Sequence, residues 1–301
     1  MGAKRKAMDW FLEGYDFDTK GAFTEKAVDA YKKAIKLDEN FIAAYVNLGF
    51  VYLQREEYEK ARKCFSEVVD REPENPVAYN NLGYVYEKME RFGTAKKMYE
   101  KALELNPEDA EAYINIGNIA DLQGDYNAAI ERYRRAIEAK PSSVNARFCL
   151  AVLYERHDMF DEAMEEYRRI LDREPNHLKS LFNLGGLCVE QGMYQEAARC
   201  LEKVVGLDPK NADAWNNLGS LYEETGEVAK AVSCYNKSIS LNAFQEEAHF
   251  NLARISRRQS GPGLGGQENE EIKKRLRFLL SINPKSAKAH RFLEELEKNG
   301  S

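Results

Sequence analysis

The chain has 301 residues, of which 44% are hydrophobic and 31% are charged, so it can form a folded core and is not a disordered tail. Lysine and arginine number 44 against 50 aspartates and glutamates, and the net charge of -6 argues against a protein that grips nucleic-acid phosphates. The five cysteines include no Cys-x-x-Cys pair, and no segment is long and apolar enough to span a bilayer, so we expect a cytoplasmic protein without a membrane anchor.

Residues 1–41 predict an irregular first helix pair. Apolar residues recur there at helical spacing, namely Trp10, Gly14, Phe17, Ala27, Tyr31 and Ala34. The interval from Gly14 to Ala27 is 13 residues, whereas the interval from Gly49 to Ala61 in the next repeat is 12. We therefore expect one extra residue in the first turn.

Residues 42–245 consist of six repeats with a period of 34 residues. The recurring positions are Leu48-Gly49, Leu82-Gly83, Ile116-Gly117, Leu150-Ala151, Leu184-Gly185 and Leu218-Gly219, then Ala61, Ala95, Ala129, Ala163, Ala197 and Ala231, then Phe65, Tyr99, Tyr133, Tyr167, Leu201 and Tyr235. The glycine and alanine let two amphipathic helices pack closely, and the large residue fills the space beside them. A proline near the end of most repeats forces the turn into the next one. Because one pair cannot bury its own apolar face, neighbouring pairs must stack.

Residues 246–301 predict a modified end of the array. A seventh repeat covers 246–286 and contains a Gly-rich insertion near 260–267, which composition marks as a loop between two helices. Pro284 follows seven residues later than the period requires. Residues 287–301 predict a polar capping helix and a tail.

These anchors resemble those of the tetratricopeptide repeat family. The repeat with Trp215, Leu218, Gly219, Tyr222, Ala231 and Tyr235 matches the family pattern best. The resemblance covers nearly the whole chain and implies an all-α fold, a right-handed α-solenoid superhelix of stacked antiparallel helix pairs. It also implies a protein that binds other proteins.

The sequence contains no recognisable catalytic or metal-binding constellation. The four histidines are far apart, and no cysteine lies at a ligand spacing from any of them. The run Gly261–Gly266 lacks the Gly-Lys-Ser/Thr ending of a phosphate-binding loop. Cys149 falls on the expected groove face, but no histidine partner is identifiable. We expect no enzymatic activity, no metal and no cofactor.

The resemblance implies that the first helix of each pair lines a concave groove. The residue before the recurring Leu is an asparagine in six of seven repeats: Asn47, Asn81, Asn115, Asn183, Asn217 and Asn251. Flanking candidates on the same face are Phe50, Asn80, Tyr84, Asn118 and Asn216, and a basic group follows at Arg254, Arg257 and Arg258. An asparagine amide can donate and accept at once, so these positions suit the main chain of an extended peptide.

Two interpretations of the asparagines stay open at this point. They can bind a ligand, as in the asparagine ladder that they resemble in the repeat arm of O-linked N-acetylglucosamine transferase. Alternatively, they can form hydrogen bonds between neighbouring helices. We expect a monomeric or weakly oligomeric scaffold that binds an extended or helical protein segment, without nucleic-acid or membrane partners. The alternative is a substrate-recruiting, non-catalytic arm of an enzyme complex such as a glycosyltransferase.

Overall fold

The structure, a computed structural model, describes residues 2–20, 25–260 and 266–298. It forms two compact units, Met1–Leu153 and Tyr154–Ser301, and in the described ranges both contain helices and no strand. Most of the Gly-rich stretch expected near 260–267 lies outside the described residues, as does the part of the first turn at 21–24 where we expected an extra residue.

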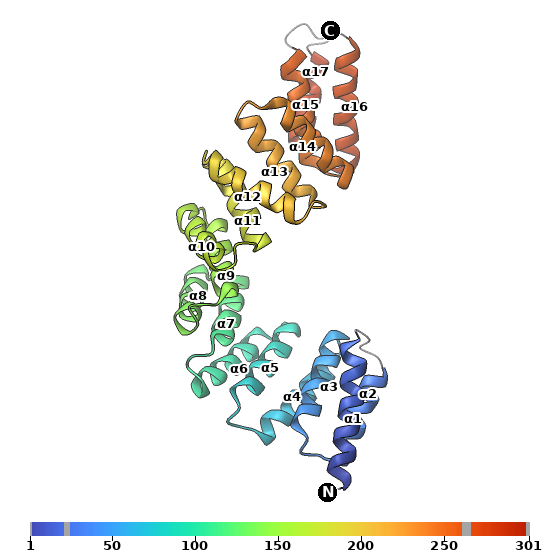
Figure 1. Ribbon diagram of the computed structural model, residues 1–301, viewed down its shortest axis with the longest axis vertical. Helices are drawn as coiled ribbons and strands as arrows, with labels where there is room; N and C mark the ends of the chain where they lie inside the picture. Colours follow the sequence, from blue (N-terminus) through green and yellow to red (C-terminus); the bar gives the residue numbers. More distant parts are fainter. Residues whose placement is uncertain (1, 21–24, 261–265, 299–301) are drawn as a thin grey trace. The chain divides into compact units, whose positions relative to one another are not determined.

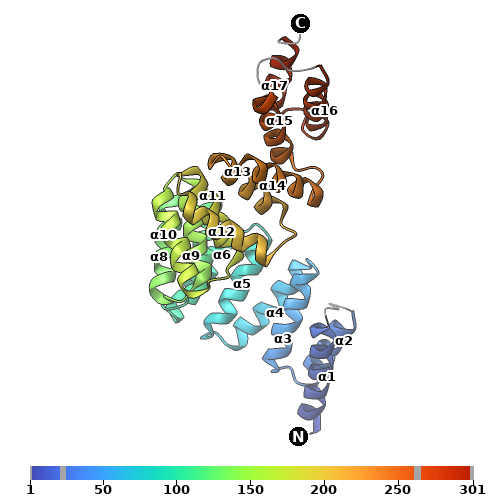
Figure 2. The same cartoon turned by 45° about the horizontal axis from the view of Figure 1, so that its top comes forward.

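Within each unit, most consecutive helices of the described ranges pack side by side. In the first unit they are α1 (Gly2–Thr19), α2 (Glu25–Leu37), α3 (Ile42–Gln54), α4 (Tyr58–Arg71), α5 (Pro76–Lys88), α6 (Phe92–Leu105), α7 (Ala110–Leu122), α8 (Tyr126–Ala139) and most of α9 (Val144–Arg156). The second unit continues with α10 (Phe160–Arg173), α11 (Leu178–Glu190), α12 (Tyr194–Leu207), α13 (Ala212–Glu224), α14 (Val228–Leu241), α15 (Glu246–Ser260), α16 (Gly266–Ile282) and α17 (Ala287–Lys298). Pairs such as α1 with α2, α5 with α6, and α13 with α14 pack against each other in both views (Figure 1 and Figure 2). The expected all-α solenoid of stacked helix pairs is confirmed.

In five of the helix pairs, an aromatic ring of the second helix closely approaches a glycine of the first. A Cβ atom built on Gly83 of α5 would lie 2.7 Å from the Tyr99 ring of α6, and one on Gly219 of α13 would lie 2.7 Å from the Tyr235 ring of α14. Both rings are completely buried. The second helix can therefore reach this distance only because the first helix carries no side chain there.

The core is continuous from one pair to the next within a unit. One buried cluster includes Tyr31 of α2, Val51 of α3, Phe65 of α4 and Val85 of α5. In the second unit, Tyr235 of α14 shares a cluster with residues of α15. Each pair thus completes its core only by packing on its neighbours, as the repeat pattern predicts.

In the six pairs from α3–α4 to α13–α14, the turn inside the pair contains one residue with a left-handed backbone. These residues recur at the repeat period and have φ between 58° and 79°: Glu56, Glu90, Gly124, Asp158, Gly192 and Gly226. Glycine adopts this conformation without strain, whereas a residue with a Cβ does so at a cost of about 1 kcal/mol. The turn geometry is therefore the same in repeats with and without glycine.

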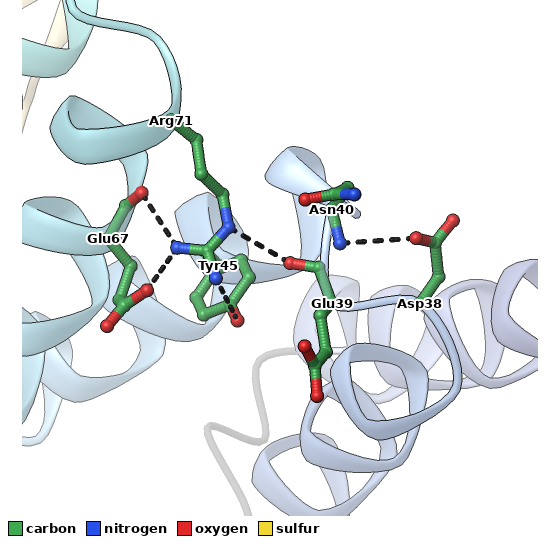
Figure 3. Close-up of polar contacts among 6 residues, drawn as sticks. All are labelled: Asp38, Glu39, Asn40, Tyr45, Glu67 and Arg71. Carbon is green, nitrogen blue, oxygen red and sulfur yellow. Dashed lines mark hydrogen bonds and ion pairs between the residues drawn. The ribbon is translucent and has the colours of Figure 1, made fainter.

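Arg71 at the end of α4 holds the preceding link between α2 and α3 (Figure 3). Its Nε donates to the carbonyl oxygen of Glu39 at 3.1 Å, and its Nη1 donates to Glu67 of its own helix. The guanidinium carbon also lies 4.8 Å from the ring centroid of Tyr45 in α3. Arg71 thus links α4 to the turn between α2 and α3 and to α3 itself.

Candidate peptide-binding groove

A groove of about 620 Å³ lies across four successive first helices, at residues of the first unit. It is lined by residues of α3, α5, α7 and the start of α9, together with the turns before α7 and α9. We call it the α3–α5–α7 groove, and it is lined by Phe50, Val77, Asn80, Asn81, Tyr84, Asn106, Glu108, Asp109, Ala110, Glu111, Ile114, Asn115, Lys140 and Asn145. The structure brings five of the sequence-predicted residues together here: Phe50, Asn80, Asn81, Tyr84 and Asn115.

Helical periodicity explains why these side chains share one face. Leu82 and Gly83 point into the core and are buried, so the residues at either side of them turn towards the groove. Asn81 and Tyr84 are three residues apart and therefore lie on the same face of α5. Asn81 is half-buried, whereas Tyr84 is 38% exposed.

Hydrogen bonds fix several amides in the groove. Asn115 donates to the side-chain oxygen of Asn80 at 3.3 Å, and Asn80 donates to Asp109 Oδ2 at 3.2 Å. The other carboxylate oxygen of Asp109 accepts from the main-chain N–H groups of Glu111 and Ala112, which caps α7. The lining between α5 and α7 is therefore ordered before any ligand arrives.

Other members of the asparagine series bond to tyrosine hydroxyls instead. Asn47 donates to Tyr31 Oη at 3.3 Å, and Asn183 donates to Tyr167 Oη at 2.8 Å. Each tyrosine lies 16 residues earlier, on the second helix of the preceding repeat. Burial raises the pKa of Tyr31 to about 12, so its hydroxyl stays protonated. For these two asparagines, the structure supports the helix-to-helix interpretation.

Asn81 and Asn217 differ because the residue 16 positions earlier has no hydroxyl. Phe65 precedes Asn81 and Leu201 precedes Asn217. Within the described part of the chain, the amides of Asn81 and Asn217 make no hydrogen bond. The sequence carried part of this signal, since a residue without a hydroxyl at this offset leaves the asparagine without that partner.

Tyr99 and Tyr235 lie 16 positions before Asn115 and Asn251 but make no hydrogen bond with them among the described residues. Tyr99 donates to Glu87 at 2.9 Å, and Tyr235 donates to Glu223 at 3.1 Å. Tyr167, by contrast, donates to Glu155 and still accepts from Asn183. Burial raises the pKa of the Glu87 carboxyl, and the hydrogen bond from Tyr99 opposes this shift. At Asn118 the direction is reversed, because its side-chain oxygen accepts a hydrogen bond from Tyr133 Oη at 2.8 Å.

The predicted positions in the second unit have varied surroundings. Asn217 lines a small cavity of about 120 Å³ with Gly186 and Ser220. Asn216 is only 9% exposed, and its side-chain oxygen has no hydrogen-bond partner among the described residues. Asn251 is half-buried. Asn216, a predicted groove residue, is therefore buried in the structure.

The basic group on α15 is partly neutralised. Arg254 Nη2 and Arg258 Nη1 each lie 2.9 Å from the Glu223 carboxylate, whose side chain is 5% exposed. Arg257 is half-buried and forms no ion pair within the described residues. Two of the three predicted arginines thus hold α15 against α13.

The described residues contain little reactive chemistry. All five cysteines are unpaired thiols, and burial raises the pKa of Cys64 and Cys188 to about 12, which disfavours the nucleophilic thiolate. No group of three or more histidine, cysteine, aspartate or glutamate side chains in the described ranges is placed to hold a metal ion. Among the described helices, none has both the length and the apolar character that crossing a membrane requires.

Comparison with family models places the repeats along most of the chain. Models described as tetratricopeptide repeat match residues 41–108, 74–142 and 212–243, and a model described as TPR repeat matches 24–55 and 185–226. The model of subunit 3 of the anaphase-promoting complex, or cyclosome, matches residues 122–204. The comparison with curated proteins gave no match.

Solved structures share the arrangement of helices. YrrB, described as a TPR protein with an unusual peptide-binding site, is 24% identical with a TM-score of 0.54, over 61% of this chain and 95% of YrrB. A chain of the APC/C hetero-tetramer Cut9-Hcn1 is 19% identical with a TM-score of 0.59, over 90% of this chain and 52% of that chain. PilF of Pseudomonas aeruginosa is 18% identical with a TM-score of 0.58, over 75% of this chain and 100% of PilF. At these identities the similarity concerns the fold.

Proposed function

The chain belongs to the tetratricopeptide repeat family, and from this premise we propose that it is an interaction scaffold whose α3–α5–α7 groove binds an extended segment of a partner protein. One observation carries the proposal. Exposed apolar side chains and the available amide of Asn81 lie beside each other in a single groove of about 620 Å³. The family supports the scaffold role, and the groove supplies the specific site.

The apolar part of the groove is unusually open to solvent. Phe50 is 41% exposed, Val77 59% and Tyr84 38%. Contiguous exposed apolar surface on a protein is a common mark of an interaction site. The Phe50 ring packs edge-on against Phe65 at 5.3 Å, so its direction is fixed. A ligand side chain that covers these rings gains the free energy of removing their area from water.

The polar part suits a main chain rather than one particular side chain. Asn81 offers two N–H donors and one carbonyl acceptor, which match the C=O and N–H groups of an extended strand. The bonds among Asn80, Asp109 and Asn115 hold the neighbouring amides in place, so little conformational entropy is lost on binding. The groove therefore combines weak sequence preference with ordered donors and acceptors.

The alternative role, a substrate-recruiting arm of an enzyme complex, stays a prediction. It requires available asparagine amides along successive repeats. Asn47 and Asn183 instead donate to tyrosine hydroxyls of neighbouring helices. This observation favours a localised site at Asn81 over a continuous ladder.

The test uses a display library of random 12-residue peptides, about the length of one extended segment. The library is panned on the full chain, and the enriched peptides are titrated by fluorescence anisotropy. The groove variant Asn81→Ala/Tyr84→Ala is expected to bind them at least tenfold more weakly, about 1.4 kcal/mol. The control Leu122→Ala/Asn127→Ala changes an exposed leucine and an exposed asparagine away from the groove and is expected to bind as wild type does.

Circular dichroism of both variants checks that helical content is unchanged. Equal affinity of the groove variant and the wild type for every enriched peptide would refute the groove as the binding site. A matching loss in the control variant would refute it as well, since the effect would not depend on the groove residues.

A further inference from the structure

A second concave site lies in the other unit, between α15 and α17. It has a volume of about 310 Å³ and is lined by Phe250 and Arg254 of α15 and by Lys288, Arg291, Phe292 and Glu295 of α17. We call it the α15–α17 pocket. Its volume is at the lower end of the range for ligand sites, so it suits one or two side chains rather than a folded domain.

Two aromatic rings form the apolar part of the pocket. The centroids of Phe250 and Phe292 are 6.0 Å apart with an interplanar angle of 70°, and both side chains are half-buried. The Lys288 ammonium lies 5.1 Å from the Phe250 centroid. The rings are thus held in an edge-to-face pair that leaves part of their surface open to a ligand.

The pocket is preformed because α17 is anchored to α15. Ser286 and Asn283 donate to the two carboxylate oxygens of Glu246 at 2.8 Å and 3.0 Å. These bonds lower the pKa of Glu246, which therefore keeps its charge near neutral pH. Lys288 forms an ion pair with Glu247 one residue further along α15. The start of α17 is consequently held at two successive residues of α15.

The charge of the pocket is opposite to that of the chain. Three cations and one carboxylate line it, whereas the whole chain has a net charge of -6. Arg254 shares Glu223 with Arg258, and Lys288 is paired with Glu247. Counting every charged partner gives four cations, Arg254, Arg258, Lys288 and Arg291, against three carboxylates, Glu223, Glu247 and Glu295.

Arg291 is the cation best placed to receive a ligand carboxylate. It is exposed and forms no ion pair within the described residues, although Glu295 lies one turn further along α17. Its guanidinium can bind a carboxylate through two N–H groups. The remaining donors of the exposed Lys288 are available to the same ligand.

We propose that the α15–α17 pocket is a second binding site, for a protein segment in which an acidic residue lies next to an apolar one. The carboxylate pairs with Arg291 and Lys288, and the apolar side chain packs on the rings of Phe250 and Phe292. A polyphosphate backbone fits less well, because two of the cations already share carboxylates and three of the six lining residues are two phenylalanines and a glutamate. With one site in each unit, the chain can hold two different segments and so bridge two partners.

The experiment isolates this pocket by using the full chain with the groove variant Asn81→Ala/Tyr84→Ala as bait. Random 12-residue peptides are panned on it, and enriched peptides are expected to contain aspartate or glutamate beside leucine, isoleucine or phenylalanine. Lys288→Gln/Arg291→Gln is expected to weaken their binding at least fivefold in fluorescence anisotropy. The control Lys274→Gln/Lys285→Gln removes the same charge from two exposed lysines of α16 and the following turn and is expected to bind within twofold of the bait.

Each outcome decides the proposal. Serine in place of the apolar residue of an enriched peptide is expected to weaken binding as well. Enrichment without acidic and apolar neighbours, or an equal loss in the pocket and control variants, overturns the pocket as the site. Binding of a uridine homopolymer that depends on Lys288 and Arg291, with no such peptide enriched, overturns a protein segment as the ligand. Because the bait lacks a working groove, failure of the groove proposal leaves this result intact.

Discussion

Gly83 offers a direct test of how the helix pairs are held together. A Cβ atom at this position would lie 2.7 Å from Tyr99 Cε1 and 2.8 Å from Cδ1. The Tyr99 ring is fully buried, and its hydroxyl is bonded at 2.9 Å to Glu87 on the same helix as Gly83. The ring therefore cannot swing aside, and Gly83→Ala must push α5 away from α6.

The size of the effect follows from two opposing contributions. Overpacking a well-packed core costs about 1–3 kcal/mol. Alanine gains up to about 1 kcal/mol over glycine in helix propensity. Gly93 lies in α6, where an added Cβ meets nothing within 4 Å, so Gly93→Ala gains propensity without the clash. The difference in unfolding free energy between the two variants is therefore expected to be about 1–3 kcal/mol, with Gly83→Ala the less stable.

Urea unfolding followed by far-ultraviolet circular dichroism measures this difference. With an m-value of about 2 kcal/mol/M, the midpoint of Gly83→Ala is expected to be roughly 0.5–1.5 M below that of Gly93→Ala. At the same repeat position, Ala253 packs in one cluster with the smaller Leu276, whereas Ala151 has a tyrosine, Tyr167, at the ring position. A smaller residue at the ring position is thus one way to make room for the methyl group. Adding Tyr99→Leu to Gly83→Ala is therefore expected to cost less than the sum of the single changes.

The reasoning would be wrong if Gly83→Ala unfolded at the same urea concentration as Gly93→Ala, or at a higher one. That result would mean that the pair spacing is soft enough to absorb a methyl group. The recurring glycine would then reflect helix entry or folding rather than the close contact between the two helices.

Three further predictions concern hydrogen bonds, charge and thiols. Asn183→Ala is expected to destabilise the second unit by about 1 kcal/mol more than Asn217→Ala in thermal unfolding, because only Asn183 is bonded to a buried tyrosine hydroxyl; equal stability would contradict the bond. Glu223→Gln is expected to lower the free energy of unfolding by about 1–3 kcal/mol, because the Glu223 carboxylate is 5% exposed and accepts from two arginines. Glu224 is exposed, so Glu224→Gln is expected to change the free energy of unfolding by less than about 0.5 kcal/mol when both variants are unfolded in urea. Cys149 is expected to react first with a thiol reagent at mildly alkaline pH, because it is half-buried whereas the other four cysteines are buried. Burial raises the pKa of all five thiols, to about 11 or 12 in those four, so access decides the order. Peptide mapping that finds a buried cysteine labelled first would refute this.

Much of the fold could be predicted because each contact that defines a helix pair lies within one repeat. Gly83 and Tyr99 are 16 residues apart, and the same small-to-large pairing recurs with the period, so the sequence pattern indicates both helices and their spacing. The left-handed turn residues were less visible. Gly124 and its equivalents suggest the conformation, but Glu56 and Glu90 adopt it without any such residue type, because the flanking helices impose the turn.

The candidate site could be predicted only in part. The face of the first helices follows from helical periodicity, and Asn81, Tyr84 and Asn115 lie together as expected. From the sequence pattern, all six asparagines were equally good candidates for binding a ligand. Their amides differ in the structure according to whether a hydroxyl of the preceding repeat reaches them, as Tyr31 reaches Asn47.

By itself, the sequence determined the all-helical class, the repeat period, the buried anchors and the face that each first helix presents. These properties depend on local spacing along one helix pair. Only the tertiary structure decided which amides remain available, that Glu223 holds two arginines, and that α15 and α17 enclose a pocket. Such contacts join residues of different repeats, and a shift of about 1 Å between helices makes or breaks them, since hydrogen bonds and ion pairs act only over short distances.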